Sequence, residues 1–184
     1  MRILGISGSL RRGSHNTRLL RAASEELPPG ATLVEWSGLA DLPAYSEDLE
    51  AAPPAPVRAF RAAVEDADAI LISTPEYNAS LPGALKNALD WASRPFPDNV
   101  LREKPAAVIG ASTGLFGAVW AQAEVRKVLK ASGARVLEAE LPVGMAETAF
   151  TEDGDLIDPE LTARLGDLLG DLVREVQSPV EQLT

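Results

Sequence analysis

Three segments of the sequence combine glycine with hydroxyl, amide or aromatic side chains, and each directly follows a short apolar run. They span residues 7–17, 73–83 and 110–118. In the first, the glycines let the backbone approach a ligand closely, and free amides at the start of the following helix attract an anion. The amide of Asn16 and the guanidinium of Arg11 or Arg12 are further donors suited to phosphate. Hydroxyls come from Ser7, Ser9, Ser14 and Thr17. This segment therefore predicts a phosphate site.

The first segment matches neither of two familiar nucleotide-binding motifs. No Gly-Lys-Ser/Thr follows its glycines, so it is not a Walker A loop, and it lacks the Gly-x-Gly-x-x-Gly of dinucleotide-binding folds. A tight connection from strand to helix would need the same small residues without any ligand. His15 is interpreted as a loop residue rather than a catalyst, because the sequence offers it no partner.

The second segment runs from Ser73 to Gly83 and is stiffened by Pro75 and Pro82. A rigid loop that exposes backbone N–H and C=O groups at the end of a strand suits recognition of a flat heterocycle with polar edges. Tyr77 could pack beside such a ring. The competing interpretation is a proline-stiffened connection in which Glu76 is merely solvated.

The third segment, from Gly110 to Gly117, again offers glycines and hydroxyls between a buried run and a helix. Alone it predicts little. Three such segments are better explained by one shared ligand than by three coincidences, provided that the fold brings them to one edge.

Short apolar runs alternate with helical patterns along the whole chain. Predicted strands cover residues 3–6, 32–36, 69–72, 106–109 and, more weakly, 135–137. Predicted helices cover about 17–27, 60–64, 81–92, 118–129 and 161–176, the last opened by Asp158 as N-cap and by Pro159. Residues 41–56 are rich in proline and acidic side chains without a period, which predicts a surface loop.

This order predicts an α/β fold, a flavodoxin-like doubly wound five-stranded parallel sheet with helices on both faces and strands that are apolar on both sides. A barrel would need about 250 residues. We expect a single domain over residues 1–184. In such sheets ligands bind beyond the carboxyl ends of the strands near the switch point, here strands one and three. The three segments are predicted to meet there.

Composition excludes several classes of protein. The 184 residues contain 17 Lys and Arg against 27 Asp and Glu, a net charge of −10, which makes nucleic acid or an anionic membrane a poor partner. With no cysteine and one histidine, the chain offers neither thiolate metal sites nor a histidine cluster for zinc. No apolar run reaches the length of a membrane span, and no signal peptide is recognisable. We expect a cytoplasmic protein.

The sequence resembles the NAD(P)H-dependent FMN reductase family, which includes bacterial enzymes described as quinone, chromate or azo reductases. The resemblance rests on two motifs and extends from Ile3 to about Leu137. The first motif is Gly8-Ser9-Leu10-Arg11 with Ser14 and Asn16. The second is Pro75-Glu76-Tyr77-Asn78, leading through Pro82-Gly83 and Leu85-Lys86-Asn87-Ala88 to Asp90-Trp91. Residues 42–50 also resemble the family's second loop.

The resemblance implies bound FMN, NADPH or NADH as co-substrate, a small-molecule electron acceptor and a homodimer or homotetramer. It implies no metal and no catalytic side chain. Residues that would hold the phosphate are Ser9, Arg11, Ser14, Asn16 and Thr17. Residues that would flank the isoalloxazine are Pro75, Glu76, Tyr77 and Asn78, and the pocket would be completed by Ser112, Gly114 and Gly117. The chain departs from the family pattern at the bulkier Leu115, Phe116 and Trp120.

The resemblance implies hydride transfer from nicotinamide to the flavin and then to a second acceptor. Two other classes share the predicted architecture. A flavodoxin-type electron carrier would fit the acidity, but it would be expected to carry Thr/Ser-x-Thr-Gly-x-Thr, where this chain has Ser-Gly-Ser-Leu-Arg-Arg. A phosphoacceptor signalling domain needs an aspartate after the third strand, where this chain has Ser73 and Thr74. For assembly, we expect Trp91 and the alanines of the helix after Pro82 to face a second copy.

Overall fold

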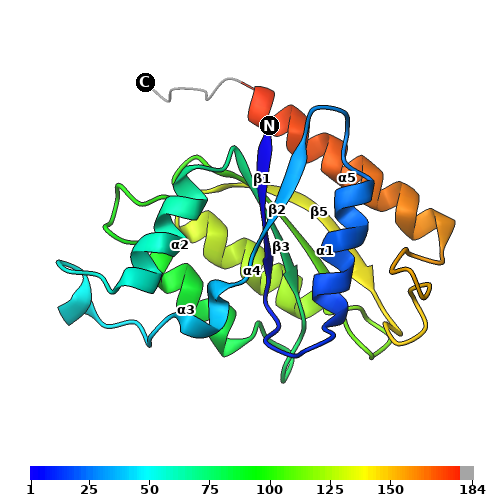
Figure 1. Cartoon of the computed structure of the whole chain (residues 1–184), viewed down its shortest axis with the longest axis horizontal. Helices are drawn as coiled ribbons and strands as arrows, with labels where there is room; N and C mark the ends of the chain where they lie inside the picture. The colour runs from blue at the N-terminus through cyan, green and yellow to red at the C-terminus, as the bar shows by residue number, and fades with distance from the viewer. Residues whose placement is uncertain (179–184) are drawn as a thin grey trace.

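A computed structural model describes residues 1–178, which form a five-stranded parallel sheet with helices on both faces (Figure 1). The strands are β1 (Arg2–Ser7), β2 (Thr32–Trp36), β3 (Ala69–Thr74), β4 (Pro105–Ala111) and β5 (Arg135–Val143). The helices are α1 (His15–Glu25), α2 (Ala55–Glu65), α3 (Gly83–Ala92), α4 (Val119–Ala131) and α5 (Pro159–Gln177). The last six residues of the predicted domain lie outside this description.

The strand order β2-β1-β3-β4-β5 confirms the predicted doubly wound topology. The chain adds β2 on one side of β1 and then β3 on the other, so the order of strand addition reverses between β1 and β3. These two strands are parallel, and their register pairs Ile6 with Ile72 and Ser7 with Ser73. One apolar cluster joins α1 and α5 to one face of the sheet, and a second joins α2, α3 and α4 to the other. The carboxyl ends of β1, β3 and β4 therefore lie side by side, as the prediction requires.

The expectation that every strand is apolar on both faces is wrong for the two edges of the sheet. Strands β3 and β4 are buried throughout, whereas β2 contains no buried residue and β5 is buried only near its end. An edge strand pairs on one side only and keeps contact with solvent. Strand β5 is also longer than predicted and continues to Val143.

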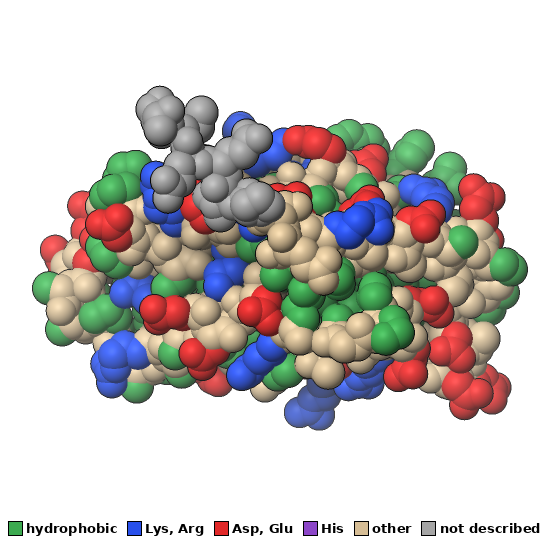
Figure 2. Space-filling model, turned by 90° about the horizontal axis from the view of Figure 1, so that it is seen from above, with side chains coloured by type: hydrophobic (Ala, Val, Ile, Leu, Met, Phe, Trp, Pro, Cys, Tyr) green, Lys and Arg blue, Asp and Glu red, His purple; other side chains and the backbone are tan. Residues whose placement is uncertain are grey.

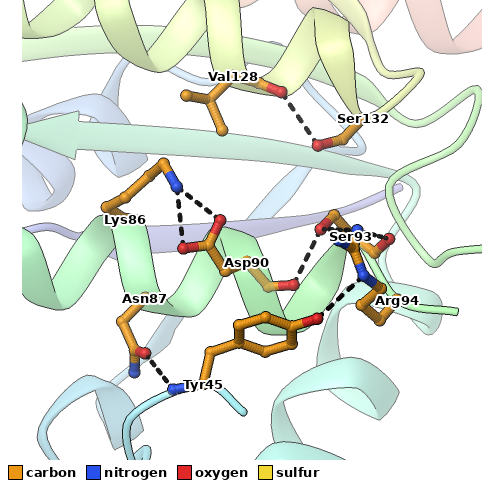
Figure 3. Close-up of polar contacts among 8 residues, drawn as sticks. All are labelled: Tyr45, Lys86, Asn87, Asp90, Ser93, Arg94, Val128 and Ser132. Atoms are coloured by element: carbon orange, nitrogen blue, oxygen red, sulfur yellow. Dashed lines mark hydrogen bonds and ion pairs between the residues drawn. The ribbon is translucent and has the colours of Figure 1, made fainter. Parts of the chain in front are cut away.

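Residues 41–56 lie mostly at the surface, as predicted, but they do not form a free loop. They include a short 3₁₀ turn, Glu47–Leu49, and the start of α2, and they are fastened to α3. Asn87 Oδ1 accepts the Tyr45 N–H at 2.8 Å, and Arg94 Nε donates to Tyr45 Oη at 3.1 Å (Figure 3). The indole of Trp91 donates to the Pro43 carbonyl at 2.8 Å and is fully buried. The prediction that Trp91 faces a second copy is therefore wrong, because this ring packs inside its own chain.

No helix among the described residues is long and apolar enough to cross a membrane. Figure 2 shows the face at the amino ends of the strands, where acidic and basic side chains alternate with apolar ones. Single-sign charge does not dominate that face. The opposite edge of the sheet, at the lower side of Figure 1, carries the loops predicted to bind a ligand.

Candidate flavin-binding site

The three predicted segments meet around one cavity of about 220 Å³ at the carboxyl ends of β1, β3 and β4. Its lining includes eight of the predicted residues: Ser9, Arg11, Ser14, Asn16, Pro75, Glu76, Tyr77 and Ser112. It also includes three that were not predicted: His15, Ala111 and Thr113. Thr17 borders two neighbouring hollows instead, and Asn78, Gly114 and Gly117 do not line the cavity.

The phosphate cradle, residues 8–17, is shaped by hydrogen bonds between near neighbours. Ser14 is the N-cap of α1, where its Oγ accepts the N–H groups of Asn16 and Thr17 at 3.1 and 3.4 Å. Within the described residues, five backbone N–H groups of the cradle have no partner: those of Leu10, Arg12, Gly13, Ser14 and His15. Free N–H groups at the start of a helix are a suitable environment for an anion.

Asn16 joins the cradle to the neighbouring strands. Its Nδ2 donates to the Ala111 carbonyl at 2.9 Å, and its Oδ1 accepts from Ser73 Oγ and from the Ala111 N–H, both at 2.9 Å. The side chain is almost fully buried. Asn16 therefore fixes the ends of β3 and β4 relative to α1, which is a positioning role that the sequence alone did not indicate.

His15 places an orphaned polar atom beside the cradle. Its Nδ1 is buried and has no hydrogen-bond partner in the described part of the chain. Burial and the nearby charges of Arg11 and Arg18 lower the pKa of the imidazole, so the ring favours its neutral form. The unpartnered nitrogen and the free cradle amides fit an anionic group such as the phosphate of FMN.

The second segment ends in a tight turn. Tyr77 and Ser80 exchange backbone hydrogen bonds at 3.0 and 3.1 Å, and Asn78 and Ala79 between them have φ values of 54° and 58°. Positive φ at both central residues defines a type I′ turn, which is strained for alanine. In the described residues, the N–H groups of Glu76, Asn78 and Ala79 have no partner. The turn presents these donors to whatever lies against it.

Two carboxylates brace this turn against α4. Glu76 Oε2 accepts the N–H groups of Trp120 and Ala121 at 3.0 and 3.1 Å. Glu124 Oε2 accepts from Ser80 Oγ and from the Leu81 N–H, and these bonds lower the pKa of its carboxyl. The N-cap of α4 is Ala118, which has no capping side chain, so Glu76 performs that role from another loop. Glu76 is therefore engaged and not merely solvated.

The third segment depends on a glycine at its most crowded point. A Cβ at Gly117 would lie 2.4 Å from the Pro142 carbonyl carbon, and φ there is 56°. At Gly114 the nearest atom would be Ser112 Oγ at 3.8 Å, so that position has room. Gly117 thus shapes the segment by close packing against the end of β5 rather than by lining the cavity.

Apolar side chains gather beside the cavity, at the bulky positions singled out in the sequence. Phe116 and Trp120 pack edge to face with ring centroids 5.3 Å apart, although each is half exposed or more. Leu115 and Met145 are also exposed, and the Met145 N–H donates to the Gly114 carbonyl at 3.0 Å. We call Leu115, Phe116, Trp120 and Met145 the rim cluster.

A larger cavity, of about 350 Å³, lies elsewhere, between α1, β2 and the loop before α5. Its walls include the carboxylates of Glu35, Asp153 and Asp155. Their charge disfavours a phosphate. The smaller cavity at the switch point is the better candidate for a nucleotide.

A doubly wound sheet with a polar cavity at its switch point is the architecture of nucleotide-binding α/β proteins. The model of the NADPH-dependent FMN reductase family matches residues 1–148, and the chain belongs to that family. It is 45% identical over 161 residues to an NAD(P)H-dependent FMN reductase of Pseudomonas aeruginosa, covering 86% of this chain and 85% of the relative. It is 40% identical over 155 residues to a quinone reductase of Pseudomonas putida, covering 83% of each.

Among solved structures, the flavoenzyme FerB of Paracoccus denitrificans, an NAD(P)H:(acceptor) oxidoreductase, superposes with a TM-score of 0.84 at 34% identity. The match covers 96% of this chain and 97% of FerB. The flavodoxin-like fold and the membership of a flavin-dependent oxidoreductase family are therefore confirmed.

Proposed function

We propose that this protein is an NAD(P)H-dependent, FMN-containing oxidoreductase that reduces a small acceptor. The observation that carries the proposal is the convergence of three loops on one cavity beside the free amides of α1. Family membership supports the same cofactor and the same electron donor. The acceptors that fit an open pocket over a flat ring are quinones, azo compounds, metal oxyanions and free flavin, and the quinone reductase relative favours a quinone.

In this proposal the phosphate of FMN lies in the cradle, held by its free N–H groups and by Ser9, Arg11, Ser14 and Thr17. Asn16 contributes by holding the cradle in place. The turn after Pro75 provides backbone donors to the ring edge, with Glu76 bracing it and the side chains of Tyr77 and Asn78 shaping the space where substrates stack. Ser112 completes the far wall, and Gly117 shapes the segment behind it by close packing. FMN supplies the hydride chemistry when bound, so no side chain need transfer a proton.

The absorption spectrum of purified protein, followed by NADPH oxidation with a benzoquinone as acceptor, tests the proposal. We expect a yellow protein that oxidises NADPH and reduces the quinone. Protein without flavin affinity would contradict it. Bound flavin that no nicotinamide nucleotide reduces would instead identify a flavodoxin-type electron carrier, whose acidic surface would dock on a basic partner.

We further propose that the chain assembles as a homodimer or homotetramer through the rim cluster. The α3 face that the sequence predicted for this contact is buried within the chain itself. Light scattering at micromolar concentration tests this, and a particle of only 19.5 kDa would contradict it. A single domain over residues 1–184 and a cytoplasmic location complete the proposal.

A further inference from the structure

The imidazole of His15 contains a buried nitrogen that no hydrogen bond satisfies. Among residues 1–178, three side chains contain a buried nitrogen without a partner: those of His15, Arg61 and Arg126. In both arginines another nitrogen of the guanidinium is engaged, since Arg61 Nε donates to the Trp91 carbonyl at 3.0 Å and Arg126 Nη2 to Glu140 at 2.8 Å. Of the three, His15 alone lines the cavity at the switch point. Its orphaned nitrogen is therefore the one that a ligand of this cavity can affect.

The His15 ring is held in place from the side of the loop after β5. His15 is the first residue of α1, and its ring stacks on that of Phe150, with an interplanar angle of 8° and centroids 6.3 Å apart. Phe150 is buried, and the guanidinium of Arg18 lies 5.6 Å from the centroid of the same ring. The stacked ring stays beside the cradle, so its charge state depends on what the cradle contains.

The titratable side chains around the ring come from three segments. They are Arg11 and Arg18 from the cradle and α1, Glu147 from the loop after β5, and Glu76 and Tyr77 from the segment after β3. Burial and the two arginines lower the pKa of the imidazole, whereas Glu147 raises it. Glu76 is directed at α4, where its carboxylate accepts two N–H groups. Without a ligand, the ring therefore favours its neutral form.

An anion in the cradle changes this balance. The N–H groups of residues 10 and 12–15 have no partner within the described part of the chain, and that of His15 is among them, so a phosphate held there lies beside the imidazole. A phosphate monoester carries a charge of about −1.5 to −2 at neutral pH. An opposite charge at about 4–6 Å favours the protonated imidazole, in which both nitrogens are donors. The phosphate thus offsets the charges of Arg11 and Arg18 and stabilises the protonated ring.

We propose that His15 takes up a proton from solvent when the phosphate of FMN enters the cradle, so that this protein binds FMN more tightly as the pH falls. The inference rests on the proposed function, because it requires FMN, and it adds a pH-sensitive residue to the cofactor site. Protonation of the FMN phosphate itself acts in the opposite direction, since it removes negative charge below about pH 6. A test must therefore separate the two protons.

NMR titration of the His15 ring proton follows one of these protons directly and requires no turnover. The full chain is titrated without flavin, with riboflavin, and with FMN. We expect a midpoint below 6.5 without flavin and with riboflavin, which has no phosphate. With FMN, the proton affinity of the ring should rise at least about tenfold. Equal midpoints with riboflavin and with FMN would overturn the inference.

The affinity for FMN gives the second measurement, by fluorescence titration of the wild-type protein and of His15→Gln. A ring that binds its proton more tightly in the complex adds affinity at low pH, and this gain is lost as the pH rises through the pKa of the complex. The ratio of wild-type to variant affinity should therefore fall about fivefold from pH 5.5 to pH 8. Protonation of the FMN phosphate affects both proteins alike and cancels in the ratio. A ratio that does not change with pH would overturn the inference.

Glu147→Gln is the matched control. It removes the exposed carboxylate that raises the imidazole pKa but keeps the histidine, so the midpoint without flavin should fall while the rise on FMN binding persists. Loss of that rise in Glu147→Gln would assign the proton uptake to this carboxylate and would overturn the role of the phosphate. A chain that binds FMN at no pH would overturn the proposed function, whereas an unchanged His15 midpoint in a chain that binds FMN would overturn this inference alone.

Discussion

The two sides of the candidate site are held together in different ways. In the phosphate cradle, the hydrogen bonds of the cap join Ser14 to residues two and three positions away. At the turn beyond Pro75, the Glu76 carboxylate accepts hydrogen bonds from residues 44 and 45 positions away, and the Glu124 carboxylate accepts one from a residue of the turn 44 positions away. The cap within the cradle is therefore a local structure that its own sequence can form, while Asn16 ties the cradle to Ser73 and Ala111. The turn has its shape only when α4 is packed beside it, so it depends on the tertiary fold.

Because the turn depends on tertiary packing, we expect the largest loss of folding stability when the packing of the third segment is disturbed. Gly117→Ala would force a Cβ into the backbone near Pro142 and strain a left-handed residue, and we expect a loss of about 3 kcal/mol or more in the free energy of unfolding. Gly114→Ala, which has room, should change it by less than about 0.5 kcal/mol. Urea denaturation of both variants measures the difference, and equal stability would refute the packing argument.

The cradle is tested by removing its charge. Arg11→Ala should weaken FMN binding by about 1.5–3 kcal/mol, because a charge-assisted hydrogen bond to the phosphate is lost. Riboflavin has no phosphate, so its affinity should not change. Fluorescence titration with both flavins measures this, and an unchanged affinity for FMN would remove Arg11 from the site.

The exposed side chain of the turn should control turnover rather than flavin binding. Tyr77, whose side chain is half exposed at the cavity, is predicted to shape the space that donor and acceptor use in succession. Tyr77→Ala should keep FMN bound but lower kcat/KM about tenfold, equivalent to about 1.4 kcal/mol of transition-state positioning. Stopped-flow reduction and reoxidation at matched flavin occupancy provide the measurement. Unchanged rates in both half-reactions would show that the turn does not form the active face.

The role of Glu76, which joins the turn to α4, is tested by comparison with the cradle. Glu76→Ala removes the cap of α4, which typically costs about 1 kcal/mol, and should weaken riboflavin and FMN binding to the same extent. Glu76→Gln keeps an oxygen that can accept the two N–H groups and should restore most of the loss. A variant that lowers the affinity for FMN but not for riboflavin would show that Glu76 acts on the phosphate, and it would contradict the distinction between the two regions.

The smallest expected effect is the pH dependence of stability that comes from His15. This is the only histidine in the sequence, so its ring proton can be followed alone by NMR. Its pKa should lie below the ordinary value of 6.5 in the flavin-free protein, because of burial and the charges of Arg11 and Arg18. Between that lowered pKa and 6.5 the unfolded chain binds more protons, so stability rises with pH. His15→Gln should remove this rise. A midpoint at or above 6.5 would show that the neighbouring arginines do not act on the ring.

The sequence allowed prediction of features that depend on near neighbours or on regular repeats. The sheet topology followed from the alternation of apolar runs, and the start of α5 followed from Asp158, which accepts the Glu160 N–H at 2.9 Å. The roles of Glu76 and Trp91 could not be predicted, because their partners lie 44 to 48 residues away. From the sequence, a carboxylate in a loop is expected to be solvated and a tryptophan on a helix to be free to contact a second copy. Only the tertiary fold brings their hydrogen-bond partners next to them.

The capping of α4 by Glu76 has a consequence for the direction in which a flavin can lie. A helix N-terminus attracts phosphate only while its N–H groups are free. Beside the cavity, the start of α4 is already occupied by the Glu76 carboxylate, whereas the start of α1 has five N–H groups around it without a partner among residues 1–178. A second anion near α4 would meet the negative charge of Glu76. The two ends of the cavity are therefore unequal, and we expect FMN to bind in one orientation, with its phosphate over α1 and its ring toward the turn.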